Sequence, residues 1–161
     1  ERSDARRYPA IDPLLSWSKY KSFIDEKEIS YAHKMLRKSH DVMQMMKVIG
    51  EEGTFVADYI DYLKGEFFDF VYLQQNAFDE VDEATPADRQ KYVFSFLYQN
   101  VLKQEFNLSG KEEALRFFQK LRQLFKGWNS IQWKTPGFEK CEREIRSVLE
   151  EKALNKEEIS A

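Results

Sequence analysis

A chain of 161 residues with 42% hydrophobic and 15% aromatic side chains can bury the core of one domain. Its 25 basic and 28 acidic residues are interspersed along the whole length and leave a net charge of −3. That balance argues against a DNA or RNA partner, because such proteins gather Lys and Arg on one surface. The first residues, ERSDARRY, do not form a signal peptide, and no apolar run reaches the roughly 18 residues of a membrane span.

The stretch RRYPAIDPLLSWSKY at residues 6–20 contains a rigid turn. Pro9 and Pro13 restrict their own backbone and that of the residue before them, so Tyr8 is held in a fixed orientation. Asp12 and Pro13 predict a helix that begins at about Pro13, because Asp accepts hydrogen bonds from free amides of the first turn and Pro lacks the amide proton. We interpret such a turn, so early in the chain, as a junction within something larger.

Apolar residues recur at three- and four-residue intervals in the next segment. They predict an amphipathic helix from Ile29 that ends at Gly50, a residue suited to a C-terminal cap. Residues 54–75 are dense in aromatic side chains and predict one long or two short buried helices. Gly65, within them, is interpreted as either a break or a point of close packing.

Cap signals begin the next helices. Thr85–Pro86 predicts a helix that runs to about Phe106, because Thr caps the first turn and Pro suits its first position. Ser109–Glu112 has the spacing of a capping box, in which each side chain accepts from the other residue's amide. The helix that follows it is predicted to run to Lys126, before Gly127.

Thr135–Pro136 repeats the cap for a last helix, from Phe138 to about Ala153. One face of this helix is apolar and carries Phe138, Cys141, Ile145, Val148 and Leu149. The charged tail, residues 154–161, is expected to fray. No segment alternates long enough with the two-residue period of a strand, so the sequence predicts an all-α helical bundle.

Few residues have the pattern of a catalytic or metal site. His33 and His40 share one helical face without an acidic partner at ligand spacing, so we interpret them as surface or packing residues. Cys141, the single cysteine, excludes an internal disulfide, favours a reducing compartment and is interpreted as a small core residue. The acidic stretch 78–88 lacks the glycine of a calcium loop and is interpreted as solvated. Because no glycine-rich phosphate loop occurs, this chain alone is expected not to cleave ATP.

Two stretches can carry more than structure. Tyr8 in its fixed turn can stack on a flat ligand, and the motif LQQNAF ends a helix with three amides and then presents Phe78 to a neighbouring site. Taken singly, each also has an ordinary explanation. Aromatic residues at turns commonly cover a core, and Gln and Asn commonly bond loop backbone.

Taken together, YPAIDPLLSWSKY and FVYLQQNAFDEVDEATP closely resemble the C-terminal region of the catalytic A subunit of V-type and archaeal-type rotary ATPases. The first motif is also similar to a stretch of the F-type catalytic beta subunit. The resemblance is strong at residues 6–20 and 72–92 and extends to most of the chain in architecture.

The resemblance implies that residues 1–12 are a junction and hinge from a nucleotide-binding domain, and that residues 13–153 form a helical C-terminal domain. The full-length parent would bind ATP or ADP with Mg²⁺, and its upstream chain would carry the phosphate loop and the catalytic glutamate. Tyr8 and Phe78 would enclose the adenine by stacking. The wall of that pocket would include Gln75, Asn76 and Ala77.

The resemblance also implies partners. In this family the helical domain alternates with those of B subunits, faces the central stalk and tilts with nucleotide occupancy, which couples ATP hydrolysis or synthesis to rotation and ion transport. The complex would be cytoplasmic and peripheral to the membrane. Two turns are candidates for the stalk contact, residues 47–53 and Phe106–Lys111, although both can be mere connections. The transported ion, proton or sodium, and the favoured direction stay open.

Two other functions remain consistent with the composition. An independent helical adaptor would dock a partner helix on its aromatic face and would need no upstream domain. A regulatory module would bind adenine nucleotides by itself. We expect the isolated chain not to do so with useful affinity, since Tyr8 and Phe78 would contact only the base.

Overall fold

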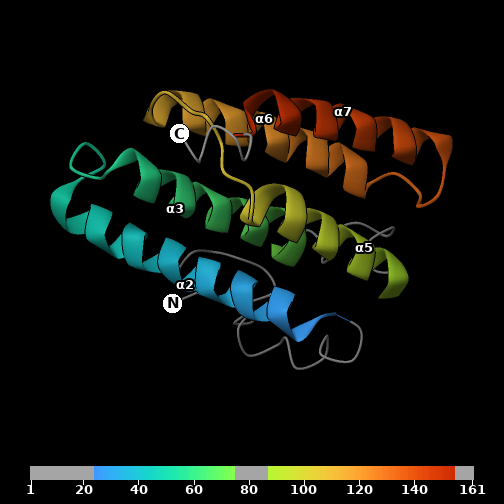
Figure 1. Ribbon diagram of the computed structural model, residues 1–161, viewed down its shortest axis with the longest axis horizontal. Coiled ribbons are helices and arrows are strands. Elements are labelled where there is room, and N and C mark those ends of the chain that lie inside the picture. Colours follow the sequence, from blue (N-terminus) through green and yellow to red (C-terminus); the bar gives the residue numbers. More distant parts are fainter. Residues whose placement is uncertain (1–23, 75–86, 155–161) are drawn as a thin grey trace.

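The computed structural model describes residues 24–74 and 87–154 (Figure 1). Within these ranges the chain forms five α-helices and two π-helical stretches: α2 (Glu26–Ile49), α3 (Val56–Phe68), η2 (Asp69–Gln74), α5 (Ala87–Leu97), η4 (Tyr98–Leu102), α6 (Lys111–Asn129) and α7 (Pro136–Lys152). The prediction of an all-α fold is confirmed. In the described ranges the only strand-like pairing is one antiparallel bridge between Phe106 and Ala153.

Several predicted features lie outside the described residues. They are the junction at residues 1–12, the helix expected from Pro13, the acidic loop after Phe78, the cap at Thr85–Pro86 and the tail from residue 155. Among the residues that the structure does describe, no helix combines the length and the apolar character needed to cross a bilayer.

The described helices form two antiparallel hairpins with α5 packed against both (Figure 1). Helices α2 and α3 lie side by side, as do α6 and α7, and α3 packs on α6. Aromatic rings from α5 join the hairpins, because Phe94 contacts Phe68 of α3 while Phe96 contacts Trp128 of α6. The core is therefore one continuous cluster, and its largest fully buried side chain is that of Trp128.

Local caps set both ends of α2. The Asp25 carboxylate accepts from the Lys27 amide at 2.8 Å, so the helix begins at Glu26, before the predicted Ile29. The predicted C-terminal cap is confirmed, because Gly50 has a φ of 80° and its amide donates to the Met46 carbonyl at 2.9 Å.

Gly65 marks a close approach of α2 and α3, and the helix does not break there. A methyl group on Gly65 would lie 2.5 Å from Ser39 Oγ and closer still to Ser39 Cβ. Ser39 Oγ donates to the Tyr62 carbonyl at 2.9 Å across the same contact. Helix α3 continues directly into η2, since Asp69 keeps helical backbone angles, so residues 56–74 form one long helix with a widened last part.

The helix that begins at Ala87 ends earlier than predicted, at Leu102 instead of about Phe106. Residues after Leu102 pair with the end of α7 and the chain that follows it: the Asn107 amide donates to the Lys152 carbonyl at 2.7 Å, and the Leu154 amide donates to the Glu105 carbonyl at 2.9 Å. The backbone groups of residues 105 and 107 therefore have partners at the end of the chain, although the sequence predicted that they would bond within the helix.

The buried side chain of Lys64 holds the same connection in place. Its ammonium donates to the Gln104 carbonyl at 2.7 Å and to the Leu102 carbonyl at 3.4 Å, and it lies 5.5 Å from the centre of the Phe106 ring. Burial lowers the pKa of Lys64, and Glu105 opposes that shift. The lysine thus fastens α3 to the end of η4.

The start of α6 corrects the predicted capping box. Gly110 is the N-cap residue and makes no side-chain cap. The Glu113 carboxylate, and not that of Glu112, accepts from the Ser109 amide and hydroxyl, each at 2.6 Å. The bond is therefore displaced by one residue, and Lys152 Nζ also donates to Glu113 at 2.6 Å.

The end of α6 also differs from the prediction, since the helix passes through Gly127 and ends at Asn129. Trp128 is fully buried and stacks on Phe138, with ring centres 4.8 Å apart, so packing extends the helix past the glycine. The predicted cap of α7 is confirmed, because Thr135 Oγ1 accepts from the Phe138 amide at 3.3 Å.

Gly65 and Gly127, both inside helices, predict opposite effects of the same substitution. Gly65→Ala should lower the free energy of unfolding by about 1–3 kcal/mol, because the added methyl group overlaps Ser39. Gly127→Ala should raise it by up to about 1 kcal/mol, because no other atom lies near and Ala favours the helix. Urea unfolding measures both, and stabilisation by Gly65→Ala would contradict the close approach.

Glu113 predicts a defined loss of stability in acid. Donation from Lys152 and then from Ser109 lowers the pKa of Glu113 from its ordinary 4.5 to about 2. A lowered pKa in the folded state stabilises the chain above about pH 4.5, and this contribution disappears as the pH falls to about 2. Glu113→Gln should therefore be less stable than the unaltered chain at pH 7 and equally stable near pH 2, as measured by urea unfolding.

The matched control for Glu113 is Glu112→Gln, because the ion pair of Glu112 with Arg116 is largely exposed and contributes little. Equal losses in the two variants at pH 7 would contradict the role assigned to Glu113.

Candidate functional site

The side chains predicted to face a ligand lie outside the described residues. These are Tyr8, Gln75, Asn76, Ala77 and Phe78. The structure does describe the chain on both sides of the segment 75–86, namely η2 before it and α5 after it. The geometry of these two flanks shows what supports the segment.

Aromatic stacking joins the two flanks. The Tyr72 ring of η2 stacks on Phe68 with ring centres 5.4 Å apart and meets Phe94 of α5 edge-on at the same separation. The Tyr72 hydroxyl also donates to the Gln90 carbonyl at 3.4 Å, in the first turns of α5. The residues that precede and follow the segment 75–86 are therefore held against each other.

The last turn of α6 binds the first flank through Asn129. The side-chain amide of Asn129 donates to the Val71 carbonyl of η2 at 2.9 Å, and both residues are buried. Nearby on the same two elements, the Arg122 guanidinium lies over the Phe70 ring, 3.9 Å from its centre. Helix α6 thus contacts η2 by one buried hydrogen bond and one cation–π pair.

The same turn binds the second flank through Arg89 of α5. The Arg89 side chain is only 4% exposed, and its guanidinium donates to the Asn129 carbonyl at 2.8 Å and the Trp128 carbonyl at 3.4 Å. These are terminal carbonyls of α6, where a cation is favoured by the negative end of the helix dipole; the Trp128 carbonyl also accepts from the Ile131 amide at 3.2 Å. The Arg89 guanidinium also lies over the Phe138 ring, 5.4 Å from its centre.

We call Val71, Tyr72, Arg89, Trp128 and Asn129 the anchor cluster. It ties both flanks of the segment 75–86 to the end of α6. The sequence does not reveal the polar members of this cluster, because a single Arg and a single Asn form no motif. The sequence offers one hint: Arg89 lies just after a predicted helix start, on the same helical face as apolar residues that are expected to face the core.

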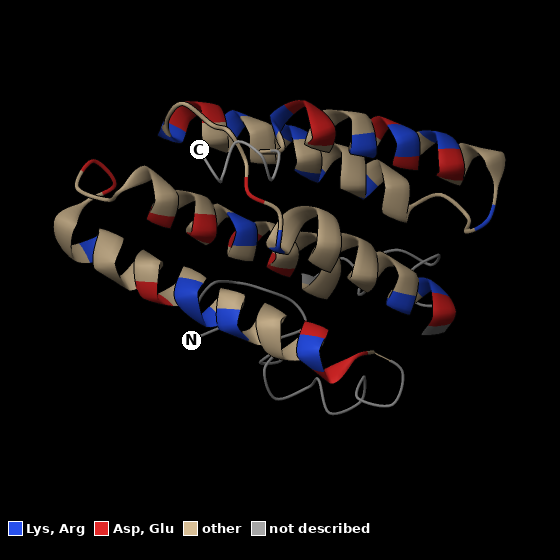
Figure 2. Ribbon diagram, viewed as in Figure 1, with Lys and Arg blue, Asp and Glu red and all other residues tan. Residues whose placement is uncertain are grey.

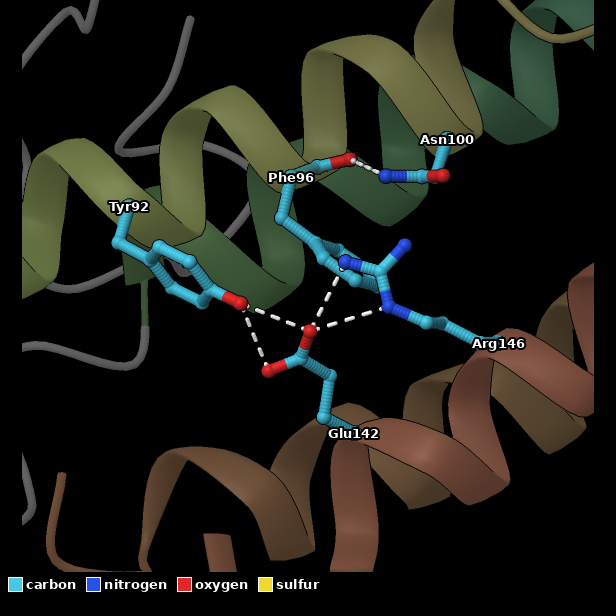
Figure 3. Close-up of polar contacts among 5 residues, drawn as sticks. All are labelled: Tyr92, Phe96, Asn100, Glu142 and Arg146. Atoms are coloured by element: carbon cyan, nitrogen blue, oxygen red, sulfur yellow. Dashed lines mark hydrogen bonds and ion pairs between the residues drawn. The ribbon is translucent and has the colours of Figure 1, made fainter. Parts of the chain in front are cut away.

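A second polar network joins α5 to α7 (Figure 3). The Tyr92 hydroxyl donates to both Glu142 carboxylate oxygens, at 2.7 and 2.8 Å, and Arg146 donates to Glu142 at 2.9 and 3.0 Å. The Arg146 guanidinium also lies over Phe96, 4.6 Å from the ring centre. Burial and the Glu142 bond raise the pKa of Tyr92, so the hydroxyl keeps its proton and acts as a donor.

The histidines and the cysteine, which are candidates for metal binding or reactivity, pack within the helices. His33 and His40 are half-buried on α2, and His40 lies 3.4 Å from the Gln44 amide. Cys141 is half-buried with its sulfur 3.8 Å from the Leu124 carbonyl, and burial raises the pKa of its thiol, which disfavours the reactive thiolate. Across residues 24–74 and 87–154, no three His, Cys, Asp or Glu side chains gather as metal ligands.

Basic and acidic residues both occur on the described α-helices, and those of α5 gather at its start (Figure 2). The most exposed large apolar side chains instead lie beside the turn between α2 and α3, where Val48 is 86% and Phe55 79% exposed. The other candidate turn differs, because Phe106 and Leu108 are both buried. Of the two candidate turns, the one at residues 47–53, with the adjoining Phe55, is thus the one with exposed large apolar side chains.

Comparison with known proteins identifies the family. A family model described as the C-terminal domain of V and A type ATP synthase matches residues 28–107. The V-type ATP synthase alpha chain 1 of Treponema pallidum is 47% identical over 150 residues, which are 93% of this chain and 25% of that protein.

Similar relatives occur in other organisms. The V-type ATP synthase alpha chain of Treponema denticola is 46% identical over 153 residues, 95% of this chain and 26% of its own length. That of Borrelia turicatae is 43% identical over 155 residues, 96% of this chain and 27% of its own length. The chain thus spans about a quarter of the length of these relatives. It belongs to the family of C-terminal domains of V and A type ATP synthase.

Proposed function

We propose that this chain closes the adenine side of a nucleotide site in the catalytic subunit of a rotary ATP synthase, and couples nucleotide occupancy to rotation of the central stalk. The subunit would bind ATP or ADP with Mg²⁺. Because the chain has no glycine-rich phosphate loop, the rest of the subunit would bind the phosphates and the metal. We assign no step of the reaction to this chain's own side chains.

The observation that carries the proposal is the attachment of η2 and of α5, the two flanks of residues 75–86, to the end of α6. The motif QQNAF at residues 74–78 begins at the last residue of η2, and the anchor cluster fixes the chain on both sides of residues 75–86. A base-binding segment needs such support, because stacking gains little if the rings must first be ordered. In this proposal Phe78 and Tyr8 stack on the base and exclude water, and Gln75, Asn76 and Ala77 form the pocket wall.

Coupling to the stalk would use the helices as a rigid body. The two hairpins share one aromatic core, and buried polar contacts of Lys64 and Arg89 tie helices that are far apart in sequence. A body of this kind tilts about a hinge instead of deforming. The hinge would be the turn Tyr8–Pro13, and neighbouring B subunits would guide the motion, which would be linked to ion transport in the membrane sector.

The turn between α2 and α3 is the better supported stalk contact of the two candidates. Its apolar side chains, Val48 and Phe55, are exposed, and it also carries Glu51 and Glu52. Lys111 Nζ donates to the Glu51 carbonyl and steadies the turn from the start of α6. Exposed apolar side chains at the end of a hairpin favour contact with another protein.

Loss of either stacking ring should weaken nucleotide binding. In the full-length subunit, Phe78→Ala and Tyr8→Ala should each weaken ATP binding about tenfold, because stacking and enclosure of the base are lost while the phosphate contacts remain. Equilibrium titration with a fluorescent ATP analogue measures the affinity.

The matched control is Leu115→Ala, an exposed apolar residue of α6 with no assigned role, which should leave ATP affinity unchanged. Unchanged affinity in both stacking variants would refute the adenine role. If this chain is encoded without a phosphate-binding domain upstream, the helical adaptor becomes the better explanation. Tight ATP binding by the isolated chain would favour the regulatory module.

The stalk contact predicts a selective loss of coupling. In the assembled complex, Val48→Ser combined with Phe55→Ser should reduce ATP-driven ion transport several-fold more than ATP hydrolysis, since interface burial of these side chains contributes about 1 kcal/mol or more each. Transport and hydrolysis are measured together in reconstituted vesicles. Asn107→Ala in the other turn is the control, and an equal or larger loss of coupling in that variant would contradict the assignment.

A further inference from the structure

We propose that Lys111 is a positioning residue for the stalk contact, which makes the turn between α2 and α3 move together with α6. This inference rests on the proposed stalk role of that turn. Lys111 does not touch the stalk in this proposal. It acts through the Glu51 and Glu52 carbonyls on the backbone that carries the exposed side chains of Val48 and Phe55.

Hydrogen bonds within the turn give it a defined shape. Gly50 has a φ of 80°, in the left-handed region, and its carbonyl accepts from the Thr54 hydroxyl at 3.1 Å. The amide of the buried Thr54 donates to the Glu51 carbonyl, also at 3.1 Å. A methyl group on Gly53 would lie 2.8 Å from the Ile49 carbonyl oxygen, so the backbone is tightly folded there. These contacts all lie within residues 49–54, so they shape the turn without fixing it to another helix.

Lys111 supplies the connection to another helix. Its ammonium donates to the Glu51 carbonyl and, at 3.3 Å, to the Glu52 carbonyl, across 60 and 59 residues of sequence. The turn and the start of α6 lie at the same end of the molecule (Figure 1). A charged donor forms a stronger hydrogen bond to a carbonyl than a neutral donor does. One side chain thus holds two adjacent peptide groups of the turn.

The start of α6, from which Lys111 extends, is itself fixed. The Glu113 carboxylate accepts from Ser109 and from Lys152 of α7, each at 2.6 Å. Ala114, in the first turn of α6, is fully buried. A displacement of the helical body therefore reaches the turn through Lys111 as well as through α2 and α3.

The order of the turn matters for the apolar contact, because the side chains proposed to meet the stalk lie on either side of the held carbonyls. Val48 precedes Glu51 and Phe55 follows Glu52, and both apolar side chains are largely exposed. An apolar contact gains less free energy when the backbone that carries it must first be ordered. Removal of Lys111 should therefore weaken the contact even though both apolar side chains remain.

The fold should tolerate the loss of Lys111. Helices α2 and α3 stay packed through the close approach of Gly65 to Ser39, which lies away from the turn. Helix α6 keeps its buried side chains, among them Phe117 and Leu121. The effect of Lys111 on the turn is therefore separable from folding.

The test compares Lys111→Ala with Lys120→Ala in the assembled complex, reconstituted in vesicles. Lys120 is the matched control, because it is an exposed lysine further along the same helix. For Lys111→Ala we expect the ratio of ATP-driven ion transport to ATP hydrolysis to fall about threefold, as for the loss of a partly solvated hydrogen bond. Lys111→Arg, which keeps a charged donor, should retain most of the ratio, and Lys120→Ala should leave it unchanged.

A double-mutant cycle tests whether Lys111 acts through the apolar contact. In the variant that combines Val48→Ser with Phe55→Ser, the further change Lys111→Ala should have little effect on the ratio, because the contact that Lys111 positions is already lost. A full additional loss in that background would overturn the proposal, since Lys111 would then act on coupling by another route.

A second readout does not require the stalk. In the full-length subunit alone, amide hydrogen exchange at residues 51–54 should become faster in Lys111→Ala and stay unchanged in Lys120→Ala and Lys111→Arg. Lys111→Met, which keeps an apolar stem but removes the donor, should behave as Lys111→Ala does in each measurement. It also provides the test if Lys111→Ala does not assemble.

Three further results would overturn the positioning role. The first is unchanged exchange at residues 51–54 in Lys111→Ala. The second is an unchanged transport ratio in Lys111→Ala while Val48→Ser with Phe55→Ser lowers it, which leaves the stalk contact standing. The third is an equal loss in Lys120→Ala, which would indicate a general effect of charge. If the Val48 and Phe55 variant also leaves the ratio unchanged, the proposed stalk contact fails and the positioning role fails with it.

Discussion

The last turn of α6 is the constraint on which the described structure depends. Within two residues it inserts an indole into the centre of the core, offers two carbonyls to Arg89 of α5 and extends an amide to Val71 of η2. Three elements that are distant in sequence are thereby fixed relative to one another. The burial of Arg89 is tolerable because terminal helix carbonyls supply the acceptors and the helix dipole supplies the favourable potential.

How far the sequence predicts this fold depends on whether the determinant is local. The caps at Gly50 and Thr135 follow from adjacent residues and are confirmed, as are the all-α class and the close packing at Gly65. The ends at Leu102 and Asn129 are set by contacts with residues far along the chain, so propensity misplaced them. The widened turns of η2 and η4 likewise leave no mark in the hydrophobic pattern.

The residues of the candidate site also differ in whether the sequence reveals them. The motifs at residues 6–20 and 72–92 were visible because several unusual residues occur together, and the family they indicated is confirmed. The residues that support the second motif were not visible, since a buried Arg and a buried Asn acquire meaning only from the carbonyls they meet. The assignment of Tyr8 and of residues 75–78 to an adenine pocket stays a prediction.

The close approach at Gly65 has a mechanical consequence. Because Gly65 has no side chain, Ser39 of α2 packs directly against the backbone of α3, and Lys111 contacts the turn that joins the two helices. A helix of 24 residues is about 36 Å long, so a rotation of about 10° at one end carries the other through about 6 Å. A rigid-body rotation of the helices of that size would therefore move the turn between α2 and α3 by several ångströms, while the close contact at Gly65 keeps these two helices together.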